Sequence, residues 1–346
     1  MELRTSGHLD PACFNASFEY IFLRQPYLRG RFACDGGAAY WVEREASTAE
    51  VQWVPSEGWD PRRLERQIDV GNGPLLACEV VRHRGLDVVR LCIDHVVFDG
   101  GSVVPLIQQL GVGYGRPSTP VQPHWDYAAY AQDHASKLDV QRHELWRYWR
   151  RLYEDVGGPY PVVRLPGLRP SLKGASEGTT CVVDMAAPQG NEVLRFFTSQ
   201  RLTPFMGFLA CLGMATVELG GAQSFAVLSS SSGRWTAGIR DVIGYFSNVI
   251  LISVGRAPAD DPLAWMDGTR NAVVGALKHA FYPRSWVLER MAPEFLEEVP
   301  SQPYLYYAGA PATPGGWRLG DTEVGAPTGG DSFVEKRLYP GVTLST

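Results

Sequence analysis

The sequence predicts a mixed α/β protein built of two lobes. The chain has 346 residues, enough for two domains of about 100–200 residues each. In both halves, segments with helical spacing of apolar residues alternate with β-branched, strand-like runs. A proline- and glycine-rich stretch at 157–178 lies near mid-chain and indicates a linker. We therefore expect an N-terminal lobe over 1–156 and a C-terminal lobe over 179–346.

The first half shows both helical and strand patterns. Apolar spacing and glycine turns predict a helix over 12–28, a strand–turn–strand unit over 29–43 and a strand over 86–94. A helix then opens near Ser102, a residue type favoured at helix N-caps, and a long amphipathic helix runs from 126 to a stop at Gly157.

The second half repeats the mixture. An almost wholly apolar helix is expected from Thr203 as N-cap and Pro204 as its first residue. The other expected elements are strands at 180–185, 224–230, 246–254 and 303–309 and an amphipathic helix over 262–283.

Composition excludes several classes of protein. A formal charge of −5 gives no basic footprint for nucleic acid. The six cysteines fall in no zinc-binding spacing, and we predict no metal site. We find no secretory signal at the N-terminus and no run of about 18 apolar residues that would span a membrane. The expected location is the cytoplasm.

The stretch CIDHVVFDGG, residues 92–101, carries the chemistry of interest. Side chains alternate along a strand, so His95 would leave the strand on its apolar face and Asp94 on the opposite face. Poor solvation there would favour the neutral imidazole, which can accept a proton near pH 7. Taken alone, the pattern also fits a strand-end histidine followed by a turn, and the two interpretations stay open.

Several segments beyond this stretch resemble condensation domains of nonribosomal peptide synthetases, within the acyltransferase superfamily of chloramphenicol-acetyltransferase-like fold. That family carries HHxxxDG, and DHVVFDG at 94–100 matches it with His95 as the second histidine and Asp94 in place of the first. Further resemblances follow in the family's order. They are LRQPYLRGRF, WDYAAYAQDH, LWRYWRRLYED, TPFMGFLACLGMAT, SSGRWTAGIRDVIGYFSNVILISV and LKHAFYPRSWVLERM.

The resemblance implies two chloramphenicol-acetyltransferase-like lobes with a tunnel and active site at their interface. It implies that an acyl or aminoacyl thioester on one carrier protein is joined to an acceptor amine or hydroxyl on another, in the synthesis of nonribosomal peptides such as antibiotics. Phosphopantetheine arms of carrier proteins, or of neighbouring synthetase modules, would deliver both substrates to a monomer with no bound cofactor. The family's opening and final segments are not found at the two ends of the chain, so we expect either a shortened member of the family or an incomplete gene model.

The resemblance also assigns roles to motif residues. His95 would orient the acceptor amine or take its proton, and a backbone N–H of Gly100 or Gly101 would help stabilise the oxyanion. Asp99 would be structural and would pair with an arginine. The candidate partners are Arg31, Arg29 and Arg234.

The resemblance also suggests residues that would line the tunnel, and it raises a question about Asp94. Ser231, Ser232 and Asn248, with Ser230 beside them, are candidates to line the tunnel. Asp94 adds a negative charge where the family has a histidine, so an inactive domain is one alternative.

Two rival functions therefore accompany the main one. The first is a free-standing acyltransferase that uses coenzyme A or a carrier protein and a small acceptor. The second is an inactive relative that recruits partner proteins.

Overall fold

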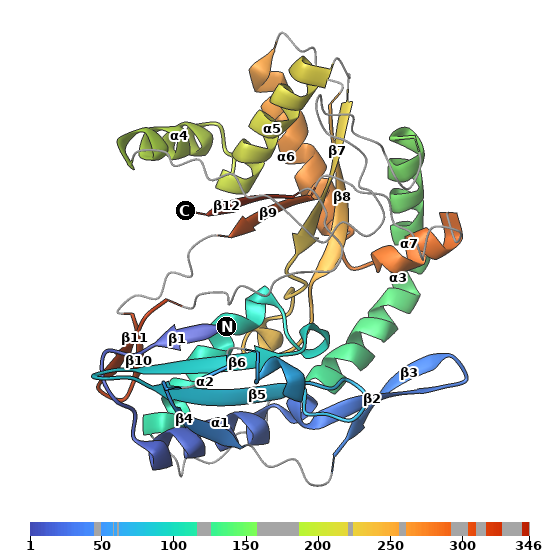
Figure 1. Ribbon diagram of the computed structural model, residues 1–346. Coiled ribbons are helices and arrows are strands. Elements are labelled where there is room, and N and C mark those ends of the chain that lie inside the picture. Colours follow the sequence, from blue (N-terminus) through green and yellow to red (C-terminus); the bar gives the residue numbers. More distant parts are fainter. Residues whose placement is uncertain are drawn as a thin grey trace. The chain divides into compact units, whose positions relative to one another are not determined.

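The computed structural model describes residues 1–44, 50–57, 59–60, 62–115, 126–157, 187–220, 224–255, 261–291, 304–308, 316–326 and 341–345. The chain divides into two compact units. Unit 1 contains Met1–Ser136, Arg234–Ser247 and Pro311–Phe333, and unit 2 contains Lys137–Gly233, Asn248–Ala310 and Val334–Thr346. Each unit mixes helices with a four-stranded sheet (Figure 1).

The sheet of unit 1 has the order β1-β6-β5-β4. Strand β6 is antiparallel to both of its neighbours, while β4 runs parallel to β5. The strands are β1 (Glu2–Arg4), β4 (Val51–Pro55), β5 (Leu76–Arg82) and β6 (Asp87–Ile93). Apolar side chains of the sheet and of helices α1 (Pro11–Arg24) and α2 (Val103–Gly115) share one core.

Helices α1 and α2 approach each other closely at Gly113. A Cβ atom there would lie 2.8 Å from the Cα of Ser17, so only glycine fits. The Ser17 hydroxyl donates to the Leu110 carbonyl oxygen at 2.6 Å. At the start of α1, the Asp10 side chain accepts from the Cys13 N–H, and Pro11 follows as the first helical residue. The N-terminus of α1 is therefore fixed by local sequence.

Smaller elements complete unit 1. Strands β2 (Gly30–Asp35) and β3 (Ala38–Glu43) form a hairpin, and the turn residues Gly36 and Gly37 both have positive φ. This confirms the predicted strand, glycine turn and strand. A second pair, β10 (Trp317–Leu319) and β11 (Thr322–Val324), is antiparallel and bridges to Thr5. Single 3-10 turns lie at Pro26–Arg29, Glu65–Gln67, His95–Val97, Gly100–Ser102 and Ala237–Ile239.

Unit 2 is built on the sheet order β12-β9-β7-β8. Strands β7 and β8 are antiparallel, and β9 is parallel to both β12 and β7. The strands are β7 (Ser224–Ser231), β8 (Asn248–Gly255), β9 (Tyr304–Ala308) and β12 (Gly341–Ser345). The helices are α4 (Ala187–Ser199), α5 (Pro204–Gly220), α6 (Pro262–Lys278) and α7 (Arg284–Met291).

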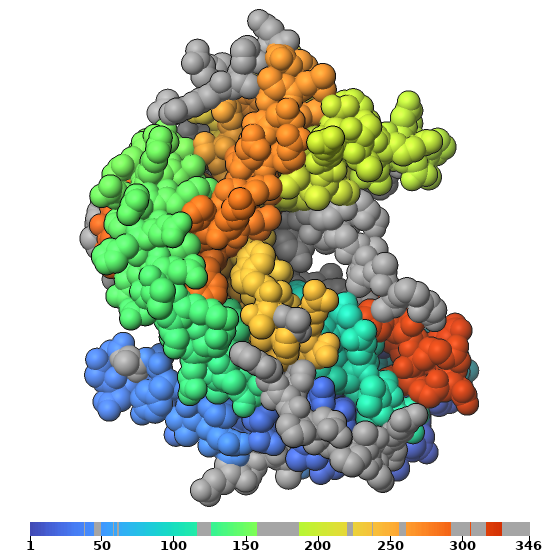
Figure 2. Space-filling model, turned by 180° about the vertical axis from the view of Figure 1, so that it is seen from behind, coloured from blue at the N-terminus to red at the C-terminus, as the bar shows by residue number. Residues whose placement is uncertain are grey.

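The long helix α3 (Tyr127–Asp155) contributes residues to both units. Its buried side chains are Leu138, Leu145, Trp149 and Tyr153, and these belong to the core of unit 2. Its other side is exposed along much of the helix, in green in Figure 2. There the charged residues pair within the helix, as in Arg142 with Asp139, an arrangement expected of a solvated helix face.

Most predicted elements are confirmed. The helices expected at 12–28, after Ser102, from 126, after Thr203 and over 262–283 all form, as do the strands at 86–94, 224–230, 246–254 and 303–309, with boundaries that differ by a few residues. The strand expected at 180–185 and all but the first residue of the expected linker 157–178 lie outside the described residues.

Among the described helices, no single one is long and apolar enough to cross a membrane. Within the part of the chain that the structure describes, one bent pair, α4 and α5 with 97° between them, passes on length and composition.

The two units do not follow the predicted boundary at 157. Each takes residues from three stretches of the chain, and 234–247 joins unit 1 although it follows strand β7 of unit 2. Composition reveals proline- and glycine-rich joints. It cannot reveal that segment 234–247 belongs to unit 1, because that assignment depends on hydrogen bonds between distant residues.

Candidate active site

The motif begins where strand β6 ends. The strand stops at Ile93, and the Asp94 side chain then accepts a hydrogen bond from the Val96 N–H at 2.9 Å. This cap opens a 3-10 turn at His95–Val97. The prediction that His95 continues the strand is therefore wrong, because Asp94 ends the strand. The His95 side chain is exposed, so the expected poor solvation is not found either.

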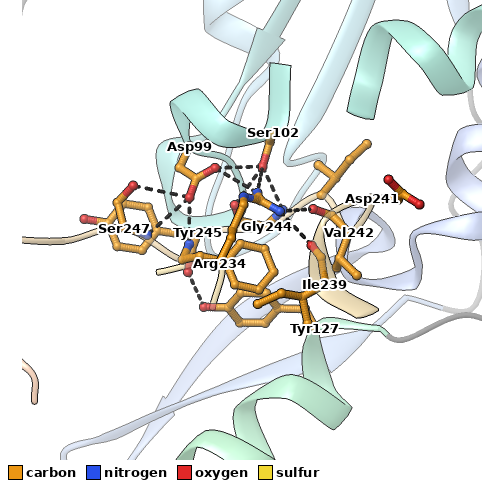
Figure 3. Close-up of polar contacts among 12 residues, drawn as sticks. Asp99, Ser102, Tyr127, Arg234, Ile239, Asp241, Val242, Gly244, Tyr245 and Ser247 are labelled. Carbon is orange, nitrogen blue, oxygen red and sulfur yellow. Dashed lines mark hydrogen bonds and ion pairs between the residues drawn. The ribbon is translucent and has the colours of Figure 1, made fainter. Parts of the chain in front are cut away.

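The Asp99 side chain of the same motif forms a buried ion pair within unit 1 (Figure 3). Arg234 Nη2 is 3.0 Å from Asp99 Oδ1, and the two side chains are 9% and 1% exposed. The second oxygen of Asp99 accepts from the Phe246 N–H at 2.9 Å and the Ser247 N–H at 3.2 Å. The Ser247 hydroxyl lies 3.3 Å from the same oxygen. Both carboxylate oxygens are thus used inside the protein.

Arg234 also binds the chain that follows it. Its Nη1 donates to the carbonyl oxygens of Ile239 at 2.9 Å and Val242 at 2.7 Å. Its guanidinium carbon lies 4.2 Å from the centre of the Phe246 ring, a cation–π contact. The planar guanidinium can serve these partners together, which a lysine ammonium cannot do. Arg234 therefore fixes the conformation of segment 234–247 as well as pairing with Asp99.

Ser102 is a further member of this cluster, and it is fully buried. Its hydroxyl accepts from Arg234 Nη2 at 2.7 Å and from the Gly244 N–H at 3.1 Å. The hydroxyl oxygen also lies 2.9 Å from Asp99 Oδ1 and 2.9 Å from the Gly244 carbonyl oxygen, either of which can take its proton. We name Asp99, Ser102, Arg234 and the backbone of 242–247 the aspartate–arginine cluster.

Gly101 leaves room for this cluster. A Cβ atom at residue 101 would lie 2.6 Å from Arg234 Nε and 3.4 Å from Asp99 Oδ1. The 2.6 Å distance is repulsive, and Arg234 is held by several hydrogen bonds, so it cannot simply move aside. The second glycine after Asp99 is thus needed for packing. Gly100 is exposed and opens the second 3-10 turn.

Aromatic side chains hold the segment 242–247 from another direction. The Tyr127 hydroxyl donates to the Tyr245 carbonyl oxygen at 2.6 Å, and the Tyr127 ring stacks on Tyr27 with ring centroids 4.2 Å apart. Burial raises the pKa of Tyr27 to about 12 and that of Tyr127 well above its usual range. Both phenols are therefore neutral at ordinary pH, and the Tyr127 hydroxyl keeps the proton that it donates. The Tyr245 ring in turn meets the His95 ring, with centroids 5.2 Å apart and an interplanar angle of 71°.

The other two arginine candidates lie elsewhere in unit 1. Arg31 Nη1 donates to the Gly71 carbonyl oxygen at 3.3 Å, and Arg29 pairs with Glu43 at 2.6 Å. Arg31 and Arg29 are therefore wrong as partners of Asp99, a place that Arg234 takes. Arg29 ends the 3-10 turn at Pro26–Arg29 and Arg31 lies in β2, and the sequence pattern of the RGRF junction could not show which partners they bind.

The three candidates for lining a tunnel differ in exposure. Ser231 is buried, with its hydroxyl 3.3 Å from the Asn248 carbonyl oxygen, while Ser232 is exposed. Asn248 opens β8, and its amide nitrogen donates to the carbonyl oxygens of Ala280 at 2.8 Å and Tyr282 at 2.7 Å. The Asn248 amide thus ties β8 to the residues after α6.

Ser102, Tyr127 and Tyr245 are members of the site that were not predicted from the sequence. Ser102 follows the motif directly, but its pattern indicated only a helix N-cap. The two tyrosines lie in segments that carry the family resemblance, yet no spacing rule connects them to His95. Among the described residues, no group of three histidine, cysteine or acidic side chains could hold a metal ion.

Comparison with protein families gives a match to the condensation domain over residues 1–295. Among curated proteins, the phosphinothricin tripeptide synthetase PhsC of Streptomyces viridochromogenes is 30% identical over 242 residues, which are 63% of this chain and 21% of the synthetase. Surfactin synthase subunit 1 of Bacillus subtilis is 26% identical over 266 residues, 72% of this chain and 7% of that protein. The chain thus spans about a fifth or less of these relatives.

Solved structures show the same fold. The X-domain from teicoplanin biosynthesis superimposes with a TM-score of 0.76 at 18% identity, covering 95% of this chain and 77% of that one. The first condensation domain of the calcium-dependent antibiotic synthetase gives a TM-score of 0.70 at 18% identity, covering 93% and 77%. These similarities bear out the predicted fold class of mixed helices and strands with chloramphenicol-acetyltransferase-like architecture.

Proposed function

Since the chain belongs to the condensation domain family, a family of acyltransferases in nonribosomal peptide synthesis, we propose that it joins an acyl or aminoacyl thioester on one carrier protein to an amine on another. The observation that carries this proposal is the family match over residues 1–295, which includes the whole motif turn. The exposed His95 next to a rigid, buried cluster supports it, because the imidazole is accessible and its surroundings are fixed.

In the proposed reaction, the acceptor amine attacks the thioester carbonyl carbon. The new C–N bond forms, the C–S bond breaks, and the proton lost by the amine passes through the His95 imidazole to the departing thiolate. A thioester is already activated, so positioning of the two substrates can supply about 7–11 kcal/mol of the barrier reduction. Proton transfer by His95 would add roughly 10²–10⁴-fold.

The tetrahedral intermediate carries a negative oxygen that needs a donor. We propose the backbone N–H of Gly100 or Gly101 for this role, since both follow the buried Asp99 in a 3-10 turn. Asp99 has a structural task in this proposal, because both of its oxygens are occupied and its side chain is 1% exposed.

Asp94 is compatible with activity in this proposal. Its carboxylate caps the turn that carries His95, so the aspartate has a structural use where the family has a histidine. Of the three tunnel candidates, we propose Ser232 for substrate contact because its side chain is exposed, whereas the Asn248 amide is occupied and Ser231 is buried. A tunnel between the lobes remains a prediction.

The proposed substrates travel on phosphopantetheine arms, and the proposed partners are carrier proteins or neighbouring synthetase modules, including modules of the same polypeptide. We further propose a monomer that acts in the cytoplasm without a bound cofactor. An ester product with a hydroxyl acceptor uses the same chemistry.

A second candidate function is the recruitment of a partner protein without catalysis. It is favoured by Asp94 in the motif and by a TM-score of 0.75 with the X-domain in its complex with OxyB from teicoplanin biosynthesis, at 19% identity. A free-standing transferase that uses coenzyme A is the other alternative, and the experiment below separates all three.

The test supplies the purified protein with a donor-loaded and an acceptor-loaded carrier protein and follows the acceptor by intact-protein mass spectrometry. We expect the acyl group to appear on the acceptor carrier and to be nearly absent with H95A. Product from acyl-coenzyme A and a small free acceptor, with none from the carriers, would favour the coenzyme A alternative. A folded protein that forms no product from any donor would overturn both enzymatic functions.

A further inference from the structure

The contact between the His95 and Tyr245 rings is not used in the proposed reaction. The two rings come from distant parts of the chain and meet at an angle of 71°, with centroids 5.2 Å apart. Both side chains are exposed, Tyr245 by 38%. Burial of a hydrophobic core therefore does not explain why the rings meet. Tilted or edge-to-face pairs at about 4.5–7 Å are the geometry that aromatic rings prefer.

The backbone of Tyr245 is fixed on both sides and at its own carbonyl group. The preceding residue, Gly244, donates its N–H to Ser102 at 3.1 Å, and the following residue, Phe246, donates to Asp99 at 2.9 Å. The Tyr245 carbonyl oxygen accepts from the Tyr127 hydroxyl at 2.6 Å. The ring thus projects from a backbone that cannot shift without breaking the aspartate–arginine cluster.

The imidazole itself sits on a short turn. His95 is the first residue of a single 3-10 turn and follows the Asp94 cap. An exposed histidine on such a turn can exchange between staggered rotamers. A neighbouring ring that projects from a fixed backbone limits that exchange, and it therefore limits the directions in which the imidazole nitrogens point.

We propose that Tyr245 is a positioning residue for His95, and this inference rests on the proposed function. Its ring restrains the imidazole, so that the nitrogen that takes the amine proton faces the acceptor. Tyr245 touches neither reacting group in this proposal and acts through His95. The aspartate–arginine cluster then has a second consequence, because it fixes Tyr245 and through Tyr245 the orientation of His95.

The variants Y245F and Y245L separate an aromatic role from a hydroxyl role. Both keep the backbone hydrogen bonds of residues 244–246, so the cluster should survive. W235L is the matched control, since Trp235 is an aromatic residue of the same segment and is 49% exposed. Thermal denaturation of all three should show folded proteins with similar midpoints.

The kinetic test measures kcat and KM with loaded carriers. Loss of orientation should lower kcat of Y245L by roughly 10–100-fold, with KM for the donor carrier nearly unchanged. Y245F should restore kcat to near the wild-type value, and W235L should keep it. If Y245L retains the wild-type kcat while the wild-type protein is active, the inference is overturned and the proposed function stands.

A second measurement does not depend on activity. In protein labelled with isotopes at histidine, the His95 ring protons, assigned with H95Q, should carry a ring-current shift from Tyr245. Couplings across χ1 should indicate one rotamer in wild type and in Y245F, and averaged rotamers in Y245L. Identical shifts and couplings in wild type and Y245L would overturn the inference. A wild-type protein that forms no product would instead overturn the proposed function, and these spectra would still decide whether Tyr245 orients His95.

Discussion

Asp94 and Asp99 belong to the same short motif, yet the structure uses them differently. Asp94 accepts one backbone N–H two residues away and is only partly buried. Asp99 is bound by Arg234, Ser102, Phe246 and Ser247, and its side chain is 1% exposed. The first contact is local, whereas the second set joins segments from distant parts of the chain. Asp94 is thus a replaceable cap, whereas Asp99 is a carboxylate on which the site depends.

The difference also explains how one motif can tolerate change. Exchange of Asp94 alters a single turn, and other side chains can serve as caps. Exchange of Asp99 leaves a buried arginine without its charge partner and frees two backbone N–H groups. Unpaired buried charge is costly, so the two positions should differ strongly in their effect on stability.

The largest expected effect is that of D99A. It should lower the free energy of unfolding of unit 1 by about 3–5 kcal/mol, because it breaks a buried ion pair. Thermal and urea denaturation, with D94A measured in parallel, check this. Equal losses for the two variants would contradict the comparison. If D99A does not fold, D99N keeps the shape of the side chain and should still be less stable than D94N.

The next largest effect is expected for G101A. A methyl group there would lie 2.6 Å from Arg234 Nε, and we expect a loss of about 1–3 kcal/mol from overpacking. The matched control is G115A, because nothing lies within 4 Å of a Cβ atom at Gly115. Urea denaturation of the two variants measures the difference. If G101A were as stable as G115A, the cluster would not be rigid.

The third prediction concerns Asp87, another buried aspartate of unit 1, and the dependence of stability on pH. Burial raises the pKa of Asp87, but hydrogen bonds from Arg82, the Leu9 N–H and His8 outweigh it and hold the pKa below its usual value. A lowered pKa in the folded state stabilises the protein above about pH 4, the pKa of unfolded aspartate. This stability is lost as the pH falls through the folded-state pKa.

D87N should therefore cost roughly 1–2 kcal/mol at neutral pH, through weaker hydrogen bonds to Arg82, and it should reduce the loss of stability below pH 4. Thermal midpoints of both proteins between pH 2 and pH 7, a range that we choose to bracket about pH 4, test the sign. Parallel curves for the two proteins would show that Asp87 does not contribute to the acid sensitivity.

The smallest effect is expected for Asp94. D94A should lower stability by about 1 kcal/mol, the usual cost of losing a cap, and D94N should be nearly neutral because asparagine caps as well as aspartate does. Differential scanning calorimetry at neutral pH resolves the two. A large loss in D94N would mean that the negative charge itself is needed.

Much of the fold follows from the sequence because its helices and strands have clear apolar spacing. The apolar run after Pro204 gave α5, and the glycine pair in β2–β3 gave the hairpin. Short strands such as β1 and β10 were missed, since three residues carry no periodicity and form only by pairing with distant chain.

Part of the site could also be predicted from the sequence. Motif spacing locates His95 and Asp99, and the family resemblance suggested Arg234 among three arginines. The alternation of side chains along the strand does not show where it ends, although the Asp94 cap is a local contact. That Tyr245 meets His95 depends on hydrogen bonds between a remote segment and Asp99, which no local pattern shows. Long-range contacts of this kind are visible only in the folded chain.

The most direct test of the central claim is the initial rate of product formation by H95A with two loaded carriers, at a concentration of folded protein equal to that of wild type. We predict that H95A keeps the thermal midpoint of the wild-type protein, because His95 is exposed. Its rate should fall by roughly 10²–10⁴-fold, the usual contribution of a general base. A folded H95A that forms product at the wild-type rate would contradict the catalytic role of His95.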